Sequence, residues 1–284
     1  MPFTAIALIV AAAAMHAAWN VILKQAGEKQ VVTWWALAVG SLLNLPLLFG
    51  ASVPAQVWPY AIASAAIEAA YFMLLIRAYQ SGDFSEVYPI ARGAAPAFIA
   101  VWAVLFLGER PQAAGLAGLA LLLAGLVVVG ASRMFAGPRT ARVNRPLVVN
   151  MLAVALCISI YSAIDAGAVR LMKPAAYNVL VLGLTALFIA PFVVARFGLR
   201  SMMSEARAGF ARIVAVGVLL LLAYMLVLEA YSMARASYVG ALREISVVIA
   251  AFAGWRLLGE RFGLARTAGA VLIFCGVMVV ALAG

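Results

Sequence analysis

The chain has 284 residues, of which 67% are hydrophobic and 11% charged, and its mean hydropathy is +1.11. Because a soluble globular protein of this length needs far more charged surface, the composition excludes that class and predicts an integral membrane protein whose main partner is the lipid bilayer. The net charge of +10 does not indicate nucleic-acid binding, since the basic residues lie in short segments between apolar runs.

Ten apolar runs have about the 20 residues that a helix needs to cross the hydrocarbon core. They are too long and too uniformly apolar for barrel strands. The first run has no preceding basic residue and the length of a span, so it is predicted as a transmembrane helix rather than a signal peptide. The predicted fold is an all-α polytopic membrane protein with transmembrane helices at 3–23, 31–50, 58–79, 84–107, 113–131, 147–169, 176–195, 211–233, 237–258 and 264–283.

The two halves of the chain share a sequence pattern at an offset of 151 positions. Leu-Gly-Glu-Arg occurs at 107–110 and again at 258–261, and Arg92 aligns with Arg243. A duplicated unit with an odd number of spans places its two copies in the membrane with opposite topology. The sequence therefore predicts two inverted five-helix repeats, at 1–131 and 147–284, joined by a basic loop at 132–146.

Most cations fall on one side of the predicted spans, and the cytoplasmic side of a membrane protein retains Lys and Arg. Both termini are therefore predicted to be non-cytoplasmic, in a bacterial-type inner membrane. The predicted cytoplasmic segments hold Lys24, Lys29, Arg133, Arg139, Arg142, Arg145, Arg196, Arg200, Arg207, Arg212, Arg256, Arg261 and Arg266. The opposite loops hold Arg110, Arg170, Lys173 and Arg235.

Several ionisable residues lie within or near the spans, where a charge costs several kcal/mol and usually faces the protein interior or a water-filled cavity. Either these groups pair with one another to hold helices together, or some of them line a substrate path; for the group as a whole we favour the second interpretation. Its members are His16, Glu68, Arg77, Arg92, Asp165, Glu229, Arg243 and Glu244.

Arg92 and Arg243 are predicted to approach a central cavity from opposite sides, because the repeat relates them. A guanidinium group can bind a carboxylate or phosphate through two hydrogen bonds. The alternative is a structural arginine bonded to a neighbouring acid or to backbone carbonyls at a helix break. Pro89 and Pro96 flank Arg92 and favour such a break.

The first helix of each half carries a polar pair with a spacing of four, which places both members on one helix face: His16 with Asn20, and Tyr161 with Asp165. His16 is either a proton carrier or a hydrogen-bonded packing residue. Asp165 is either the better proton carrier or the partner of an arginine. Proton coupling is therefore one possibility, and no cofactor is predicted because no nucleotide-binding or metal-binding motif occurs.

Aromatic residues accompany these charges, and they suit a substrate with an apolar or aromatic body and a charged head. The predicted substrate-lining aromatics are Trp19, Tyr79, Tyr88, Trp102, Tyr161 and Tyr224. Glycines in the last span of each half allow close approach of helices, either within the bundle or in a dimer, so the protein is predicted to be a monomer or a homodimer. They are Gly115, Gly118, Gly125, Gly269 and Gly276.

These motifs resemble the ten-helix EamA-type members of the drug/metabolite transporter superfamily over nearly the whole chain. The matching parts are Trp19-Asn20 with Lys24, the stretch 78–96, and the two Leu-Gly-Glu segments, each followed by a glycine-rich span. The resemblance implies inverted repeats around a central cavity, alternating access, and export of amino acids, other metabolites or drugs. The chain is also similar to YddG-type amino-acid exporters. Small relatives carry a coupling glutamate in their first helix, whereas residues 14–18 here contain no acid, which argues against their proton-for-cation exchange.

The balance of buried charges beside aromatic residues favours a zwitterion, so the leading hypothesis is a secondary transporter that exports amino acids or similar amphipathic metabolites. The alternatives are an exporter of cationic drugs or other metabolites, an intramembrane enzyme, or a channel. An enzyme is disfavoured because one histidine and two separated cysteines provide no nucleophile–base pair or metal motif.

Overall fold

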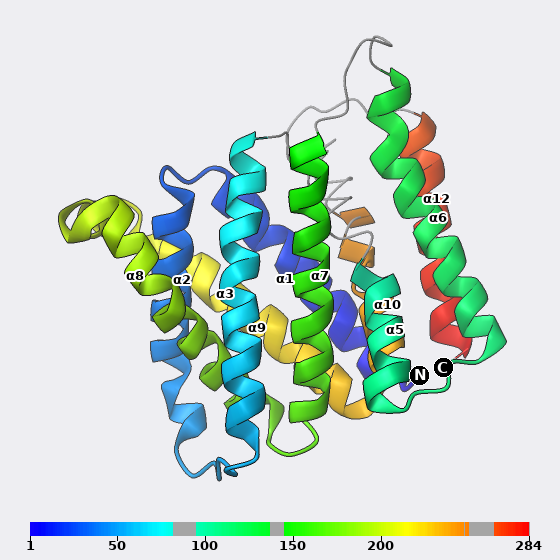
Figure 1. Ribbon diagram of the computed structural model, residues 1–284, viewed down its shortest axis with the longest axis horizontal. Helices are drawn as coiled ribbons and strands as arrows, with labels where there is room; N and C mark the ends of the chain where they lie inside the picture. Colours follow the sequence, from blue (N-terminus) through cyan, green and yellow to red (C-terminus); the bar gives the residue numbers. More distant parts are fainter. Residues whose placement is uncertain (82–94, 137–144, 247, 250–263, 284) are drawn as a thin grey trace.

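The computed structural model describes residues 1–81, 95–136, 145–246, 248–249 and 264–283 (Figure 1). The described part of the chain contains helices and no strand, which confirms the all-α prediction. Within the described ranges, six helices are long and apolar enough to cross a membrane: α1, α2 continued by η1, α3, α7, α8 and α9. The elements are α1 (Phe3–Lys24), α2 (Lys29–Asn44), η1 (Leu45–Leu48), α3 (Val57–Ser81), α5 (Ala95–Leu107), α6 (Ala113–Ala136), α7 (Arg145–Ala168), α8 (Pro174–Ala208), α9 (Phe210–Met233), α10 (Ala236–Leu242) and α12 (Leu264–Ala283).

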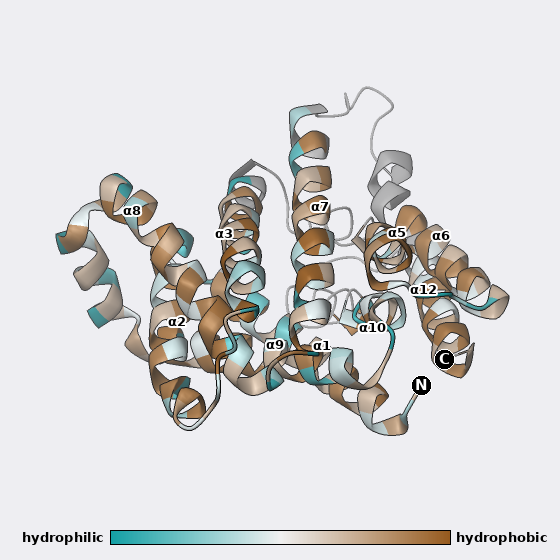
Figure 2. Ribbon diagram, turned by 60° about the horizontal axis from the view of Figure 1, so that its bottom comes forward, coloured by the Kyte–Doolittle hydropathy of each residue, from teal (hydrophilic) through white to brown (hydrophobic). Residues whose placement is uncertain are grey.

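The helices of the two halves pack in a pattern that repeats itself. Helix α1 packs on α9 as α7 packs on α3, and α2 packs on α9 as α8 packs on α3. Helices α6 and α12, the last of each half, pack on each other. Apolar residues are spread over the whole assembly (Figure 2), and both chain ends lie at the same end of the bundle (Figure 1). The two halves thus interlock rather than fold as separate bodies.

Glycines bring the backbones of α6 and α12 into direct contact. A Cβ atom added to Gly276 would lie 2.5 Å from the backbone nitrogen of Leu122 and 2.7 Å from the carbonyl oxygen of Gly118. One added to Gly125 would lie 2.7 Å from the carbonyl oxygen of Gly269. Glycine lets helices in a membrane approach this closely, where van der Waals contact replaces the hydrophobic effect. These four glycines therefore pack within one chain.

Two predicted spans differ from the helices found. The predicted span 176–195 is part of a longer helix, α8, which continues to Ala208 across a non-helical residue, Gly198. Gly198 has φ +72°, a conformation that glycine adopts without steric penalty, so the chain bends there and resumes its helix. The predicted span 237–258 begins as α10, which ends at Leu242. Residues 247 and 250–258 of that span, and 84–94 of the predicted span 84–107, lie outside the described residues, so the count of ten spans stays a prediction.

Candidate functional site

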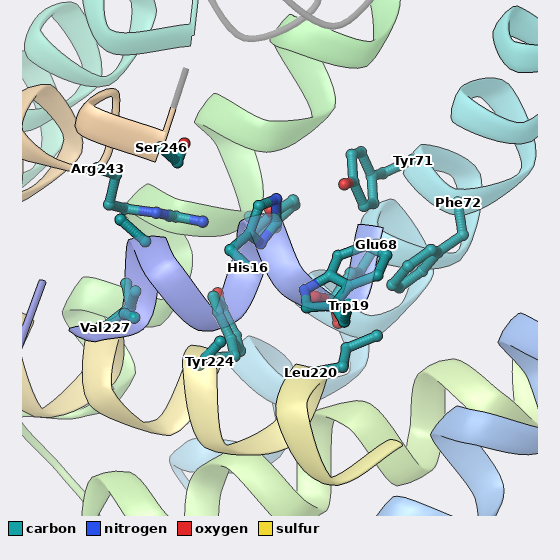
Figure 3. A pocket seen from close by; sticks show the side chains of 14 residues that line it. His16, Trp19, Glu68, Tyr71, Phe72, Leu220, Tyr224, Val227, Arg243 and Ser246 are labelled. Carbon is teal, nitrogen blue, oxygen red and sulfur yellow. The ribbon is translucent and has the colours of Figure 1, made fainter. Parts of the chain in front are cut away.

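A cavity lies between α1, α3, α7 and α9 and reaches the residues that follow α10 (Figure 3). Its volume is about 40 Å³, which is space for roughly three water molecules. Both halves of the chain line it: Trp19 and Glu68 come from the first, Tyr161 and Arg243 from the second. We call this space the central cavity.

Arg243 provides the buried positive charge of the central cavity. It directly follows α10, is 7% exposed, and extends from that side toward His16 (Figure 3). Its Nη1 donates to Ser162 Oγ at 3.2 Å and to the Tyr231 hydroxyl at 3.3 Å. Among the described residues, Nη2 and Nε make no hydrogen bond. Within the described part of the chain, the guanidinium group is thus held through one nitrogen, and Nη2 and Nε remain as donors for a ligand.

Asp165 acts on Arg243 through Tyr224. The carboxylate is fully buried and accepts hydrogen bonds from the hydroxyls of Tyr177, at 2.6 Å, and of Tyr224. The ring of Tyr224 lies 5.8 Å from the guanidinium carbon of Arg243, which is the arrangement of a cation–π contact. Asp165 does not itself line the cavity. Asp165 instead holds the hydroxyl of Tyr224, whose ring contacts the guanidinium group of Arg243.

Glu68 provides the acid of the central cavity. It lies on α3, is 4% exposed, and accepts a hydrogen bond from Thr185 Oγ1 at 3.0 Å. The same hydroxyl lies 2.9 Å from the carbonyl oxygen of Val181 in its own helix α8, so its single proton is shared between the two acceptors. A carboxylate has room for several further hydrogen bonds, so Glu68 can accept from a ligand as well.

Aromatic rings form most of the remaining wall. Tyr161 stands edge-on to Tyr71 at 5.8 Å and to Tyr224 at 6.0 Å, measured between ring centroids. His16 is half-buried and meets Trp19 edge-on at 4.9 Å. The indole Nε1 of Trp19 is buried and has no hydrogen-bond partner among the described residues. A buried donor without a partner is unfavourable, so this N–H is a ready contact for a ligand with an acceptor.

The other predicted site residues lie elsewhere. Asn20 shares a helix face with His16 but donates to its backbone carbonyl at 2.8 Å, and Trp102 donates to Ser159 Oγ at 3.0 Å, between α5 and α7. Arg77 is exposed, Glu229 is half-buried and Glu244 is buried beside Arg243. Tyr88, Arg92 and the side chain of Tyr79 lie outside the described residues, so the predicted pairing of Arg92 with Arg243 stays a prediction.

In the sequence Glu109 stands out only as part of a repeated motif, whereas in the structure it caps a helix. Gly108, with φ +66°, turns the chain after α5, and the buried carboxylate of Glu109 meets the start of α10. It accepts from the backbone N–H of Ala236 at 2.5 Å, from that of Ser237 at 3.3 Å, and from the Ser237 hydroxyl. A carboxylate at this position satisfies donors that a helix beginning leaves free. Glu109 thus caps the helix that precedes Arg243.

Other neighbours of the site were also not predicted. The sequence feature that could have identified Ser162, Thr185 and Tyr177 is a hydroxyl group within a long apolar helix. Periodicity assigns such a residue to a helix face but does not identify the helix that it meets. The hydrogen bond of Tyr231 with Arg243 depends on the turn that follows α10, which the sequence pattern does not reveal.

Comparison with known proteins gives a family. The comparison with curated proteins yields no match. One solved crystal structure of a protein is similar over 99% of this chain and 98% of its own, with a TM-score of 0.74 and 19% sequence identity, which shows a shared fold. Residues 3–131 and 146–282 each match the EamA-like transporter family. The chain therefore belongs to the EamA-like transporter family of the drug/metabolite transporter superfamily and is a multi-pass membrane transporter with two copies of the family's domain.

Proposed function

We propose that the protein is a secondary-active exporter of amino acids or similar small amphipathic metabolites, with apolar and aromatic amino acids leading. The observation that supports this most is the buried guanidinium group of Arg243, with donors to spare, in an aromatic cavity that also contains Glu68. The family match does not specify a subgroup, so the substrate class is argued from this cavity.

The two charges suit the two ends of a zwitterion. A substrate carboxylate would bind Nη2 and Nε of Arg243 and accept from Trp19 Nε1, and a substrate ammonium group would donate to Glu68. Figure 3 shows Arg243 and Glu68 on different sides of the cavity, with rings between them. Aromatic faces would contact an apolar side chain.

The small volume supports alternating access. Pockets that hold small molecules usually measure a few hundred Å³, whereas the central cavity measures about 40 Å³. A substrate therefore requires the surrounding helices to move apart. Two inverted repeats provide two equivalent ways of doing so, one toward each side of the membrane, and the repeated packing of α1 on α9 and α7 on α3 supports this arrangement.

Counterflow in proteoliposomes tests the proposal. Vesicles are loaded with one unlabelled compound at a time, and accumulation of its labelled form is followed for phenylalanine, leucine, tyramine, phenylpropionate and a quaternary ammonium dye. Saturable counterflow of the amino acids, with weaker transport of tyramine and phenylpropionate, supports a zwitterion site. Robust counterflow of another class, without any amino acid, contradicts the substrate assignment.

Replacing Trp19 with Phe is expected to weaken substrate binding without unfolding the protein. Part of the aromatic contact remains, but one ring of the indole is lost together with its donor Nε1, which has no partner among the described residues. A single hydrogen bond of about 0.5–1.5 kcal/mol corresponds to roughly a 2- to 10-fold rise in KM. Trp34→Phe is the matched control: its Nε1 donates to the carbonyl oxygen of Ala186 at 3.0 Å, so this change should lower thermal stability and leave KM unchanged. Equal KM values for Trp19→Phe and the wild type would contradict the role of Trp19.

Export of organic cations is the second candidate, because Glu68 and the aromatic wall also suit such a ligand. The buried guanidinium group of Arg243 disfavours it through like-charge repulsion. The two candidates differ in one measurement: transport of the quaternary ammonium dye should improve in Arg243→Gln if the protein exports cations, and should stay absent if it carries zwitterions.

Proton coupling and orientation are further parts of the proposal. Glu68 is the acid that lines the cavity, whereas both oxygens of Asp165 are engaged by tyrosines, so we favour Glu68 over Asp165 as a proton carrier; His16 is the other candidate. The cation distribution supports non-cytoplasmic termini in a bacterial-type inner membrane. Transport should then respond to an imposed pH gradient in the wild type and not in Glu68→Gln.

A further inference from the structure

A second cavity lies at the end of the bundle that carries both chain termini (Figure 1). Its volume is about 410 Å³, about ten times that of the central cavity. Its wall includes Arg170, which follows α7, and Arg235, which follows α9. We call it the end vestibule; Glu109, Tyr231, Ser232 and Tyr238 also line it.

The end vestibule has a net positive charge, because two arginines and one acid, Glu109, line it. Arg170 and Arg235 are exposed, while the carboxylate of Glu109 is buried and bonded to the start of α10. Among the described residues, the guanidinium group of Arg170 makes no hydrogen bond or ion pair. Arg235 donates to the Tyr238 hydroxyl at 3.4 Å and lies over its ring. Both guanidinium groups therefore have free donors.

Arginines are uncommon at this end of the molecule. The sequence places thirteen cations on the other side and only Arg110, Arg170, Lys173 and Arg235 here. The charge preference of membrane insertion disfavours Lys and Arg in translocated loops. Two of these four residues nevertheless line one cavity, which points to a local use for their charge.

Tyr231 connects the end vestibule to the central cavity. Its ring lines the vestibule and is 4% exposed, while its hydroxyl accepts from Nη1 of Arg243, which lines the central cavity. A carboxylate on Nη2 and Nε of Arg243 would therefore bind the same planar group that holds this hydroxyl through Nη1. A shift of the guanidinium group as the carboxylate leaves would change the hydrogen bond that holds the Tyr231 side chain.

We propose that the end vestibule is a second binding site for the carboxylate of the transported substrate, held by Arg170 and Arg235 and separated from the central cavity by Tyr231. The identity of the substrate rests on the proposed function. A substrate that leaves the single guanidinium group of Arg243 meets the pair Arg170 and Arg235 in the vestibule, so its carboxylate passes from one arginine site to another before it reaches water.

Cysteine labelling tests the site without requiring transport. Ser232 lines the end vestibule and is exposed, so Ser232→Cys is made in a Cys157→Ala, Cys275→Ala background. Its reaction rates with an anionic (sulfonatoethyl) and a cationic (trimethylammonioethyl) methanethiosulfonate are compared. Ser52→Cys, an exposed serine in the loop before α3 at the same end, is the matched control. The ratio of anionic to cationic rates should be at least about threefold higher at position 232 than at position 52.

Two further measurements complete the test. Arg170→Gln with Arg235→Gln should lower the ratio at position 232 to that of the control, and benzoate should slow labelling there where benzylamine does not. An equal ratio at the two positions, a ratio that the double replacement leaves unchanged, or labelling that is indifferent to benzoate would each overturn the proposal. If the labelling results hold but no amino acid shows counterflow, the vestibule stands and the proposed substrate class fails.

Discussion

Replacing Arg243 with Ala is expected to lower transport at least about 100-fold while the protein still reaches the membrane in folded form. The guanidinium group is the buried cation of the central cavity, and charge-assisted hydrogen bonds to a carboxylate contribute about 1.5–3 kcal/mol or more in such a setting. Arg243→Lys keeps the charge but loses the planar pair of donors, so an intermediate loss of about tenfold is expected. Initial rates of counterflow measure both effects.

A structural contribution of Arg243 can be separated from a role in binding. Arg243→Gln retains a neutral donor for Ser162 or Tyr231, so its thermal stability should stay close to that of the wild type while its transport falls as in Arg243→Ala. Arg200→Ala, at an exposed position beyond the bend at Gly198, is the control and should transport normally. Wild-type flux in Arg243→Gln would show that the substrate does not use this charge.

Replacing Gly276 with Ala is expected to be the most disruptive single-methyl change in the bundle. The new Cβ would lie 2.5 Å from a backbone nitrogen of α6, and backbone atoms cannot move aside as a flexible side chain can. Overpacking of this kind typically costs about 1–3 kcal/mol, and separating α6 from α12 along their length adds to it. We expect a clear fall in the temperature of aggregation in detergent, measured by size-exclusion chromatography after heating.

Gly183→Ala provides the matched control for Gly276→Ala. The same methyl group at position 183 would meet the Cβ of Ser41 at 3.8 Å, an ordinary contact distance. Since alanine favours a helix over glycine by up to about 1 kcal/mol, this variant should be as stable as the wild type or more stable. If both variants melt together, the close approach of α6 and α12 does not limit stability.

The helical layout could be predicted from sequence because the bilayer imposes a length and a hydropathy on each crossing. Apolar runs near 3–23, 58–79 and 211–233 correspond to α1, α3 and α9 to within a few residues. The course of α8 was not predictable in this way. A glycine inside a helical pattern does not reveal whether the chain ends its helix or bends and continues, and Gly198 does the latter.

For the site, the sequence identified the buried charged residues but not their hydrogen-bond partners. The repeat offset singled out Arg243, and the general cost of burying charge in a membrane singled out Glu68 and Asp165. Their different surroundings were not predictable, because Tyr177, Tyr224 and Thr185 meet these acids only through helix packing. Spacing placed Asn20 beside His16 on one face but could not show that its amide would bond a carbonyl of its own helix.

Glu109 has a mechanical consequence. It belongs to the first half of the chain, yet it grips the first residues of α10, a helix of seven residues whose far end carries Arg243. A helix of two turns moves nearly as one body. A displacement of the corner between α5 and α6 would therefore shift α10 and, with it, Arg243. The position of a residue in the first half of the protein, Glu109, thereby influences the position of the buried cation that the second half contributes.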